Sequence, residues 1–515
     1  MKRTRREFLA DVGGGMLVAS VGSSLAFDLG LVAPAFAADD LKELRFGPLE
    51  PLVRLMQETP PEKLLPLLVE KLHAGTELRT LVAAAALANA RTFGGQDYVG
   101  FHSFMALAPA HSMAEELPPE RRPLPVLKVL YRNSDRIQAF GGRGREVLHE
   151  IEGDALPADH GTDALQQATR KGDYDLAERA FAALMKGPMG EAYNHLQFSV
   201  QDEVDVHRVV LSWRAWESLD LTGPEHAHSL LRQSVRYCVS AEQSRISRGM
   251  PAPEIRALLP KLLDQYRLLE GAQPSRAAED GWVAAMGRTI ANADRAEAAE
   301  AVAAALAEGF RPEDVAEALC LAANELVLRD PGMPREGASE ERPAGSVHGA
   351  SVGVHAADAA NAWRHIARVS SPRNTFASVI VGAYHTAGQG KRLHENPYPW
   401  AEHLERATAR DPASLLEELD EAIRAKDQGR ACAIVQRYGE GGHPARPVLD
   451  RLLSYAISED GALHAEKYYR TASEEFAAAR PAFRWRQLVA LSRVTASEFG
   501  RAAPGFTRAR ELLKV

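Results

Sequence analysis

Hydrophobic and polar positions alternate at helical spacing along almost the whole chain. Residues 76–93 are rich in alanine and contain no run of β-branched side chains. Glycine, proline and short polar clusters separate predicted helices of about 12 to 20 residues. No segment of useful length has the strict alternation of a half-buried strand, so the pattern predicts an all-α protein. The clearest amphipathic segments are 60–73, 175–186, 295–308, 312–328 and 412–425.

A second pattern, made of histidine and proline, occurs four times. Each copy has a hydrophobic residue, a histidine, a helical stretch and a proline 17 residues after the histidine, and in the first three copies a tyrosine follows (Tyr131, Tyr237 and Tyr384). We predict a single all-α domain of about four multi-helix units, at 50–150, 160–245, 295–390 and 410–515, with extra helices at 246–294. Such units cannot close their own cores, so we expect them to stack as a solenoid or a closed α/α toroid. The pairs are Phe101-His102 with Pro119, Val206-His207 with Pro224, Val354-His355 with Pro372, and Leu463-His464 with Pro481.

The repeated histidines are the candidate metal ligands. If equivalent helices from four units line one cavity, their histidines point inward together. Imidazole with a nearby carboxylate suits Fe, Mn, Cu or Zn and leaves positions open for a substrate or oxygen. The alternative is structural, with each histidine hydrogen-bonded to a neighbouring turn. The predicted ligands are His102, His207, His355 and His464.

Residues ten positions further along return to roughly the same helix face as the histidines. This offset selects Glu217, His365 and Glu474. We predict that Glu217 and His365 are catalytic, as metal ligands or proton-transfer groups beside the metal. A third possibility is hydrolysis by a carboxylate pair, as in toroidal glycosidases, for which Glu217 and Asp358 are the candidates.

The first 37 residues have the features of an export signal. A basic start is followed by a mildly apolar stretch at 12–27 and a small-residue cleavage site at Ala35-Phe36-Ala37. Residues 4–9 (TRREFL) resemble the twin-arginine signal, although a chance arginine pair in an ordinary secretory signal is the alternative. We therefore expect a mature domain of 38–515 that is periplasmic or secreted, with no membrane span after the signal is removed.

Composition narrows the possible partners. The chain has 515 residues, 45% hydrophobic and 25% charged, and a formal charge of −8, which argues against a nucleic-acid surface. The three cysteines allow one disulfide at most and form no CxxC motif. A collagen or a polytopic membrane protein is also excluded.

Two of the histidine-containing segments support a family resemblance. Residues 206–216 (VHRVVLSWRAW) and 354–365 (VHAADAANAWRH) resemble the histidine-containing helices of the questin oxidase-like family, over about half of the chain. The resemblance implies an all-helical fold and the oxidative ring opening of an anthraquinone with a reduced nicotinamide cofactor. Matched by position in these segments, the site residues that the resemblance implies correspond only to His207 and His355. Because an exported protein has no supply of that cofactor, oxidation here would need another electron source or a bound metal.

Together these features predict an exported helical enzyme. The expected activity is that of a metal-dependent oxidoreductase acting on a small aromatic or apolar molecule in a central histidine-rich cavity. The alternative is a non-catalytic helical-repeat protein that binds a partner of the cell envelope.

Overall fold

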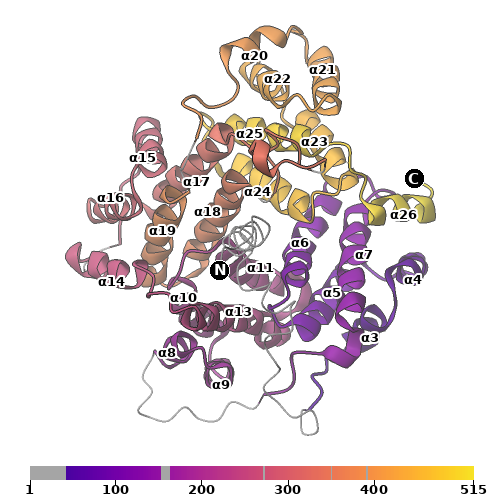
Figure 1. Ribbon diagram of the computed structural model, residues 1–515, viewed down its shortest axis with the longest axis vertical. Helices are drawn as coiled ribbons and strands as arrows, with labels where there is room; N and C mark the ends of the chain where they lie inside the picture. The colour runs from indigo at the N-terminus through magenta and orange to yellow at the C-terminus, as the bar shows by residue number, and fades with distance from the viewer. Residues whose placement is uncertain (1–41, 152–162, 271–272, 341, 350, 390–392) are drawn as a thin grey trace, which may run out of the picture.

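The computed structural model describes residues 42–151, 163–270, 273–340, 342–349, 351–389 and 393–515 (Figure 1). The predicted signal at 1–37 lies outside these residues. The described part is built of packed helices and contains no β-strand, only two isolated bridges, which confirms the all-α prediction. Within this part of the chain, no helix is long and apolar enough to cross a membrane.

The helices follow one another in four groups along the chain. The first group is α3 (Glu50–Glu58), α4 (Pro61–His73), α5 (Leu78–Phe93), α6 (Tyr98–Glu115) and α7 (Pro123–Phe140). The second is α8 (Ala164–Lys171), α9 (Tyr174–Leu184), α10 (Met189–Val200), α11 (Val206–Glu217), α12 (Leu219–Thr222) and α13 (Ala227–Ser247). The third is α14 (Ile255–Gln265), α15 (Asp280–Asn292), α16 (Arg295–Ala307), α17 (Pro312–Arg329), α18 (Val352–Val369) and α19 (Pro372–Ala387). The fourth is α20 (Ala401–Arg406), α21 (Pro412–Arg424), α22 (Gln428–Glu440), α23 (Arg446–Ser458), α24 (His464–Ala478), α25 (Arg484–Glu498) and α26 (Pro504–Leu513).

Four inner helices, one from each group, surround the middle of the molecule (Figure 1). Helix α6 contacts α11, α11 contacts α18, α18 contacts α24, and α24 contacts α6 again. Each inner helix also packs against the long helix that follows it, namely α7, α13, α19 or α25. The inner helices therefore form a closed cycle, in which the last group of the chain returns to the first.

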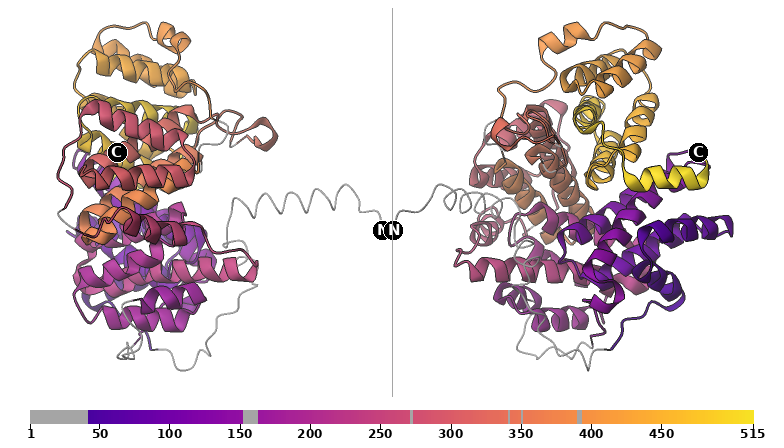
Figure 2. Two further views of the ribbon diagram at one scale, coloured as in Figure 1. Left: turned by 90° about the vertical axis from the view of Figure 1, so that its left-hand side faces the viewer. Right: turned by 45° about the vertical axis from the view of Figure 1, so that its right-hand side comes forward.

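The two ends of the described chain meet on one side of this cycle. The C-terminal helix α26 packs against α7 and α4 (Figures 1 and 2). In the same region, Lys128 of α7 forms an ion pair with Glu466 of α24, with 2.7 Å between Nζ and Oε1, and both side chains are buried. A polar contact inside the apolar core thus joins the first group to the last.

Small residues set the closest approaches between helices. Gly353 of α18 lies so near α17 that an added Cβ would be 2.6 Å from the Cα of Val327. Gly382 of α19 faces the side chains of Leu319 and Trp363 in the same way. Helices can pack this closely only where a side chain is missing, so these glycines fix the spacing of the third group.

Candidate functional site

The four repeated histidines come together in the centre of the cycle, and we call them the histidine ring. Adjacent imidazoles around the ring have centroids 4.9 to 5.7 Å apart. The Nε2 atoms of His355 and His464 are 3.5 Å apart. Each inner helix thus contributes one member to the ring: His102, His207, His355 and His464.

The ring forms at the amino-terminal ends of the inner helices. His102 is the fifth residue of α6, His207 the second of α11, His355 the fourth of α18 and His464 the first of α24. Local sequence favours a helix start at these points, because Asp97, Asp205 and Ser351 are N-caps whose side chains accept a backbone N–H from the first turn. The positive ends of four helix dipoles therefore lie near the ring and oppose a bound cation, so the imidazole donors would have to outweigh them.

Hydrogen bonds at Nδ1 fix how three of the rings are turned. The Nδ1 of His102 lies 2.7 Å from the carbonyl oxygen of Tyr98, and that of His464 lies 3.1 Å from the carbonyl oxygen of Ala462. The Nδ1 of His207 lies 3.3 Å from the carboxylate of Asp205. An imidazole that donates from Nδ1 leaves Nε2 as a bare lone pair.

Two of these Nε2 atoms are buried without a hydrogen-bond partner. Among the described residues, the Nε2 atoms of His102 and His207 make no hydrogen bond, although each is shielded from solvent. Burial and the nearby Lys467 lower the pKa of His102 and of His464 well below the usual range, and burial with His207 and Lys467 does the same for His355. Buried lone pairs that lack a donor are costly, so these atoms are suited to an electrophilic partner.

Aromatic rings cover one side of the histidine ring. Tyr98 lies 4.3 Å from His102 between ring centroids and 5.6 Å from His207. Phe101 packs between the same two imidazoles and against Tyr237. These contacts hold His102 and His207 in place and exclude water from their apolar edges.

The connection between α17 and α18 closes over another part of the ring. Its Val347 N–H donates to the hydroxyl of Ser497, and its Gly349 N–H donates to Glu498 at 2.9 Å. A Cβ added at Gly349 would be only 1.9 Å from the Cβ of His464. Only the last residues of this connection, from Ser346 to Gly349, pack inward, whereas residues 331–340 and 342–345 are mostly exposed.

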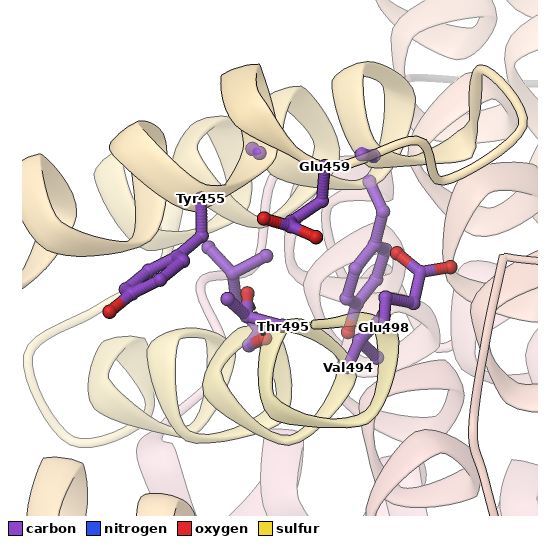
Figure 3. A pocket seen from close by; sticks show the side chains of 9 residues that line it. Tyr455, Glu459, Val494, Thr495 and Glu498 are labelled. Carbon is purple, nitrogen blue, oxygen red and sulfur yellow. Dashed lines mark hydrogen bonds between the residues drawn. The ribbon is translucent and has the colours of Figure 1, made fainter. Parts of the chain in front are cut away.

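Glu498 itself lies beside a small internal hollow between α23, α24 and α25 (Figure 3). The hollow measures about 20 Å³, room for a single water molecule, and also has Glu459 and Thr495 in its wall. Burial raises the pKa of Glu498 to about 7 against the lowering effect of the Gly349 N–H. A wider hollow of about 540 Å³ lies near Trp485 and Tyr398. The lining of neither hollow includes a ring histidine.

Two buried charged residues, Asp358 of α18 and Lys467 of α24, lie about one helical turn beyond the ring histidines of the same helices. Asp358 accepts a hydrogen bond from Thr471 at 2.8 Å, and burial raises the pKa of its carboxyl. Lys467 is buried as well. Burial lowers the pKa of Lys467 to about 8, opposed by the charge of Asp358.

The residues selected by the ten-residue offset form a second cluster, apart from the ring. Glu474 lies 3.2 Å from Nε2 of His365 and 2.8 Å from Arg470, while Glu217 pairs with Arg214 at 2.6 Å. Burial tends to raise the pKa of Glu474, but His365 and the neighbouring arginines outweigh it and hold the pKa at about 2. The structure therefore brings the sequence-selected Glu217, His365 and Glu474 near one another.

Their distance from the ring restricts what Glu217 and His365 can do. Ten residues of helix correspond to about 15 Å along the axis. This separation removes both residues from direct contact with anything bound between the ring imidazoles. The catalytic role of Glu217 and His365 stays a prediction. Of the two roles considered, proton transfer fits this distance better than metal ligation does. Glu217 and Asp358 each have a hydrogen-bonding or ionic partner of their own.

Sequence reasoning missed the residues that support the ring. Asp205 was not selected, although an aspartate two residues before a histidine at a helix start is a recognisable N-cap. Trp213 is part of the buried core and also stacks on His365 of the second cluster, with 4.5 Å between ring centroids. Gly349 carries no sequence signal at all, because only the folded chain brings it against His464.

Comparison of the chain with models of known protein families, with curated proteins and with solved structures returned no match in any of the three. The resemblance to the questin oxidase-like family therefore stays a prediction.

Proposed function

We propose that the histidine ring binds a transition-metal ion and that the protein is an exported, metal-dependent oxidoreductase acting on a small aromatic or apolar molecule. The observation that carries the proposal is the convergence of four imidazoles from four distant segments, two of which have buried Nε2 lone pairs without a partner. A shared metal ion would satisfy these atoms together.

The spacing of the ring supports this ligand set. Two imidazole nitrogens bound to one tetrahedral ion at about 2.0–2.2 Å lie roughly 3.3–3.6 Å from each other. The Nε2 atoms of His355 and His464 are 3.5 Å apart. In the described residues no group of three or more His, Cys, Asp or Glu side chains is already arranged to hold an ion, so binding would require the imidazoles to move closer together against their Nδ1 contacts.

The donor set also bears on the reaction. Imidazole suits Fe, Mn, Cu and Zn, and of these Fe, Mn and Cu supply one-electron chemistry and can bind oxygen. The chain's own residues would hold and orient the ion through their Nδ1 bonds, and Tyr98 and Phe101 would exclude water from the imidazole edges. The second cluster, with His365 and Glu474 partly open to solvent, would exchange protons with the interior.

Elemental analysis of the untagged protein, purified without added metal, tests the proposal. We expect one transition-metal ion per chain, and we expect the metal-free protein to take up Co²⁺ with the absorption bands of a nitrogen-ligated ion. His207→Ala and His355→Ala should each abolish uptake, whereas His443→Ala, outside the ring, should not. A folded wild-type protein that contains no metal and takes up no Co²⁺ would overturn the proposal.

The oxidoreductase activity needs its own measurement. We expect the metal-loaded protein to consume oxygen in the presence of hydroquinones, and His207→Ala to lose this consumption together with the metal. Oxygen uptake that is equal in the loaded and metal-free proteins would contradict an oxidation at the ring.

A further inference from the structure

The recurring tyrosines of the sequence share a structural property. Each hydroxyl donates a hydrogen bond to a carboxylate: Tyr131 to Glu62, Tyr237 to Asp205 and Tyr384 to Glu254. Of these carboxylates, Asp205 contacts a member of the histidine ring. Tyr237 thus reaches the ring through one intervening group.

The contacts of Asp205 restrict its orientation. Its Oδ1 accepts the backbone N–H of His207 at 3.1 Å and lies 3.3 Å from Nδ1 of the same residue. Its Oδ2 accepts the hydroxyl of Tyr237, which is itself largely buried between α11 and α13. With both oxygens engaged, the carboxylate cannot rotate away from the imidazole without losing a hydrogen bond.

This arrangement differs from that of His102 and His464. Those two imidazoles lie against neutral backbone carbonyls, of Tyr98 and Ala462, whereas His207 lies against a carboxylate. A carboxylate attracts the Nδ1 proton more strongly than a carbonyl does, and this makes the far nitrogen a stronger electron donor. The ring is therefore electronically unequal.

We infer that Tyr237 and Asp205 form a positioning pair that fixes the tautomer and direction of His207 and makes it a more strongly donating imidazole than His102 and His464. The inference rests on the proposed function, because it concerns the metal affinity of that site. The aromatic contacts of Phe101 with both His207 and Tyr237 support it, since they hold the two side chains in one packed unit.

Binding of Co²⁺ alone to the metal-free protein tests this pair. Asp205→Asn keeps an N-cap for α11 but removes the charge, and we expect a loss of affinity of about 10- to 100-fold with a shift of the cobalt absorption bands. Tyr237→Phe removes one hydroxyl, and we expect a smaller loss with a shift in the same direction. Tyr384→Phe removes the equivalent hydroxyl from a carboxylate away from the ring and is the matched control, with wild-type affinity and bands.

The outcomes separate the two proposals. Wild-type affinity and unchanged bands in both Asp205→Asn and Tyr237→Phe, with binding still lost in His207→Ala, would overturn the positioning pair and leave the metal site standing. An equal loss of Co²⁺ affinity in Tyr384→Phe and Tyr237→Phe would also overturn the positioning pair, because the loss would then not depend on contact with Asp205. Absence of Co²⁺ binding in the wild type would overturn the proposed function and this inference with it.

Discussion

At the scale of single residues, the centre of the molecule is held by contacts that tolerate little change. The Nδ1 atoms of His102 and His464 lie against backbone carbonyls, and that of His207 lies against a carboxylate. The Gly349 backbone lies directly against His464. Each contact has a definite chemical identity, so conservative substitutions can test it individually.

Gly349→Ala introduces a methyl group where there is no room for one. The new Cβ would be 1.9 Å from the Cβ of His464, a backbone-attached atom that cannot turn aside. We expect a loss of about 1–3 kcal/mol in the free energy of unfolding and weaker Co²⁺ binding. Gly144→Ala is the control, because nothing lies within 4 Å of that position. Equal stability of the two variants in urea would refute the contact.

Glu498 gives the protein a pH-dependent stability. Burial raises its pKa from 4.5 to about 7, so the folded state holds the proton more tightly than the unfolded state. The free energy of unfolding should therefore fall as pH rises from about 4.5 to 7, by about 3 kcal/mol from this group, and then level off. Glu498→Gln should flatten that part of the profile, measured by urea unfolding at pH 5 and pH 8. The exposed Glu308→Gln should leave the profile unchanged; a flattened profile in both would contradict this assignment.

At the scale of helices, the sequence predicted the elements well and their contacts poorly. Amphipathic periodicity predicted helices, and the His–Pro spacing selected four that occupy the same position in each group, because such patterns are local. The Nδ1 partners of His102 and His464 are backbone carbonyls, which have no sequence signature. The ten-residue offset selected residues that the fold links through Glu474 and Arg470, and the same offset, a rise of about 15 Å along each helix, separates their cluster from the ring.

Gly353→Ala tests the closest helix contact. Its added Cβ would lie 2.6 Å from the Cα of Val327, and backbone cannot yield as a flexible side chain does. We expect a loss of about 2–3 kcal/mol from the forced separation of α17 and α18. Gly281→Ala, in α15 with nothing within 4 Å, should instead gain about 0.5–1 kcal/mol. Thermal unfolding of both variants would measure the difference, and a stabilised Gly353→Ala would contradict the packing.

At the scale of the whole molecule, the chain closes on itself. Helix α24 of the last group contacts α6 of the first, and the buried pair of Lys128 and Glu466 lies at that junction. Lys128 also donates to the carbonyl oxygens of Ala456 and Glu459. The closure therefore depends on charges as well as on apolar packing.

Removing one charge of this pair should lower the free energy of unfolding more than removing both charges does. Glu466→Leu leaves a buried ammonium group, and Lys128→Met leaves a buried carboxylate, so each should cost about 3–5 kcal/mol. The double variant should cost less than either single variant, and therefore less than their sum, as a double-mutant cycle in urea would measure. Strict additivity would contradict a direct coupling between the two charges.

The closed cycle has a consequence for biosynthesis. Consecutive ring histidines are separated by more than one hundred residues along the chain. A nascent chain that has not yet reached His464 cannot assemble the ring, and no proteolytic fragment from one group can retain it. If the ring binds a metal ion as proposed, loading would follow the last long-range contact, between α6 and α24, and uptake of the ion would report that an individual chain has finished folding.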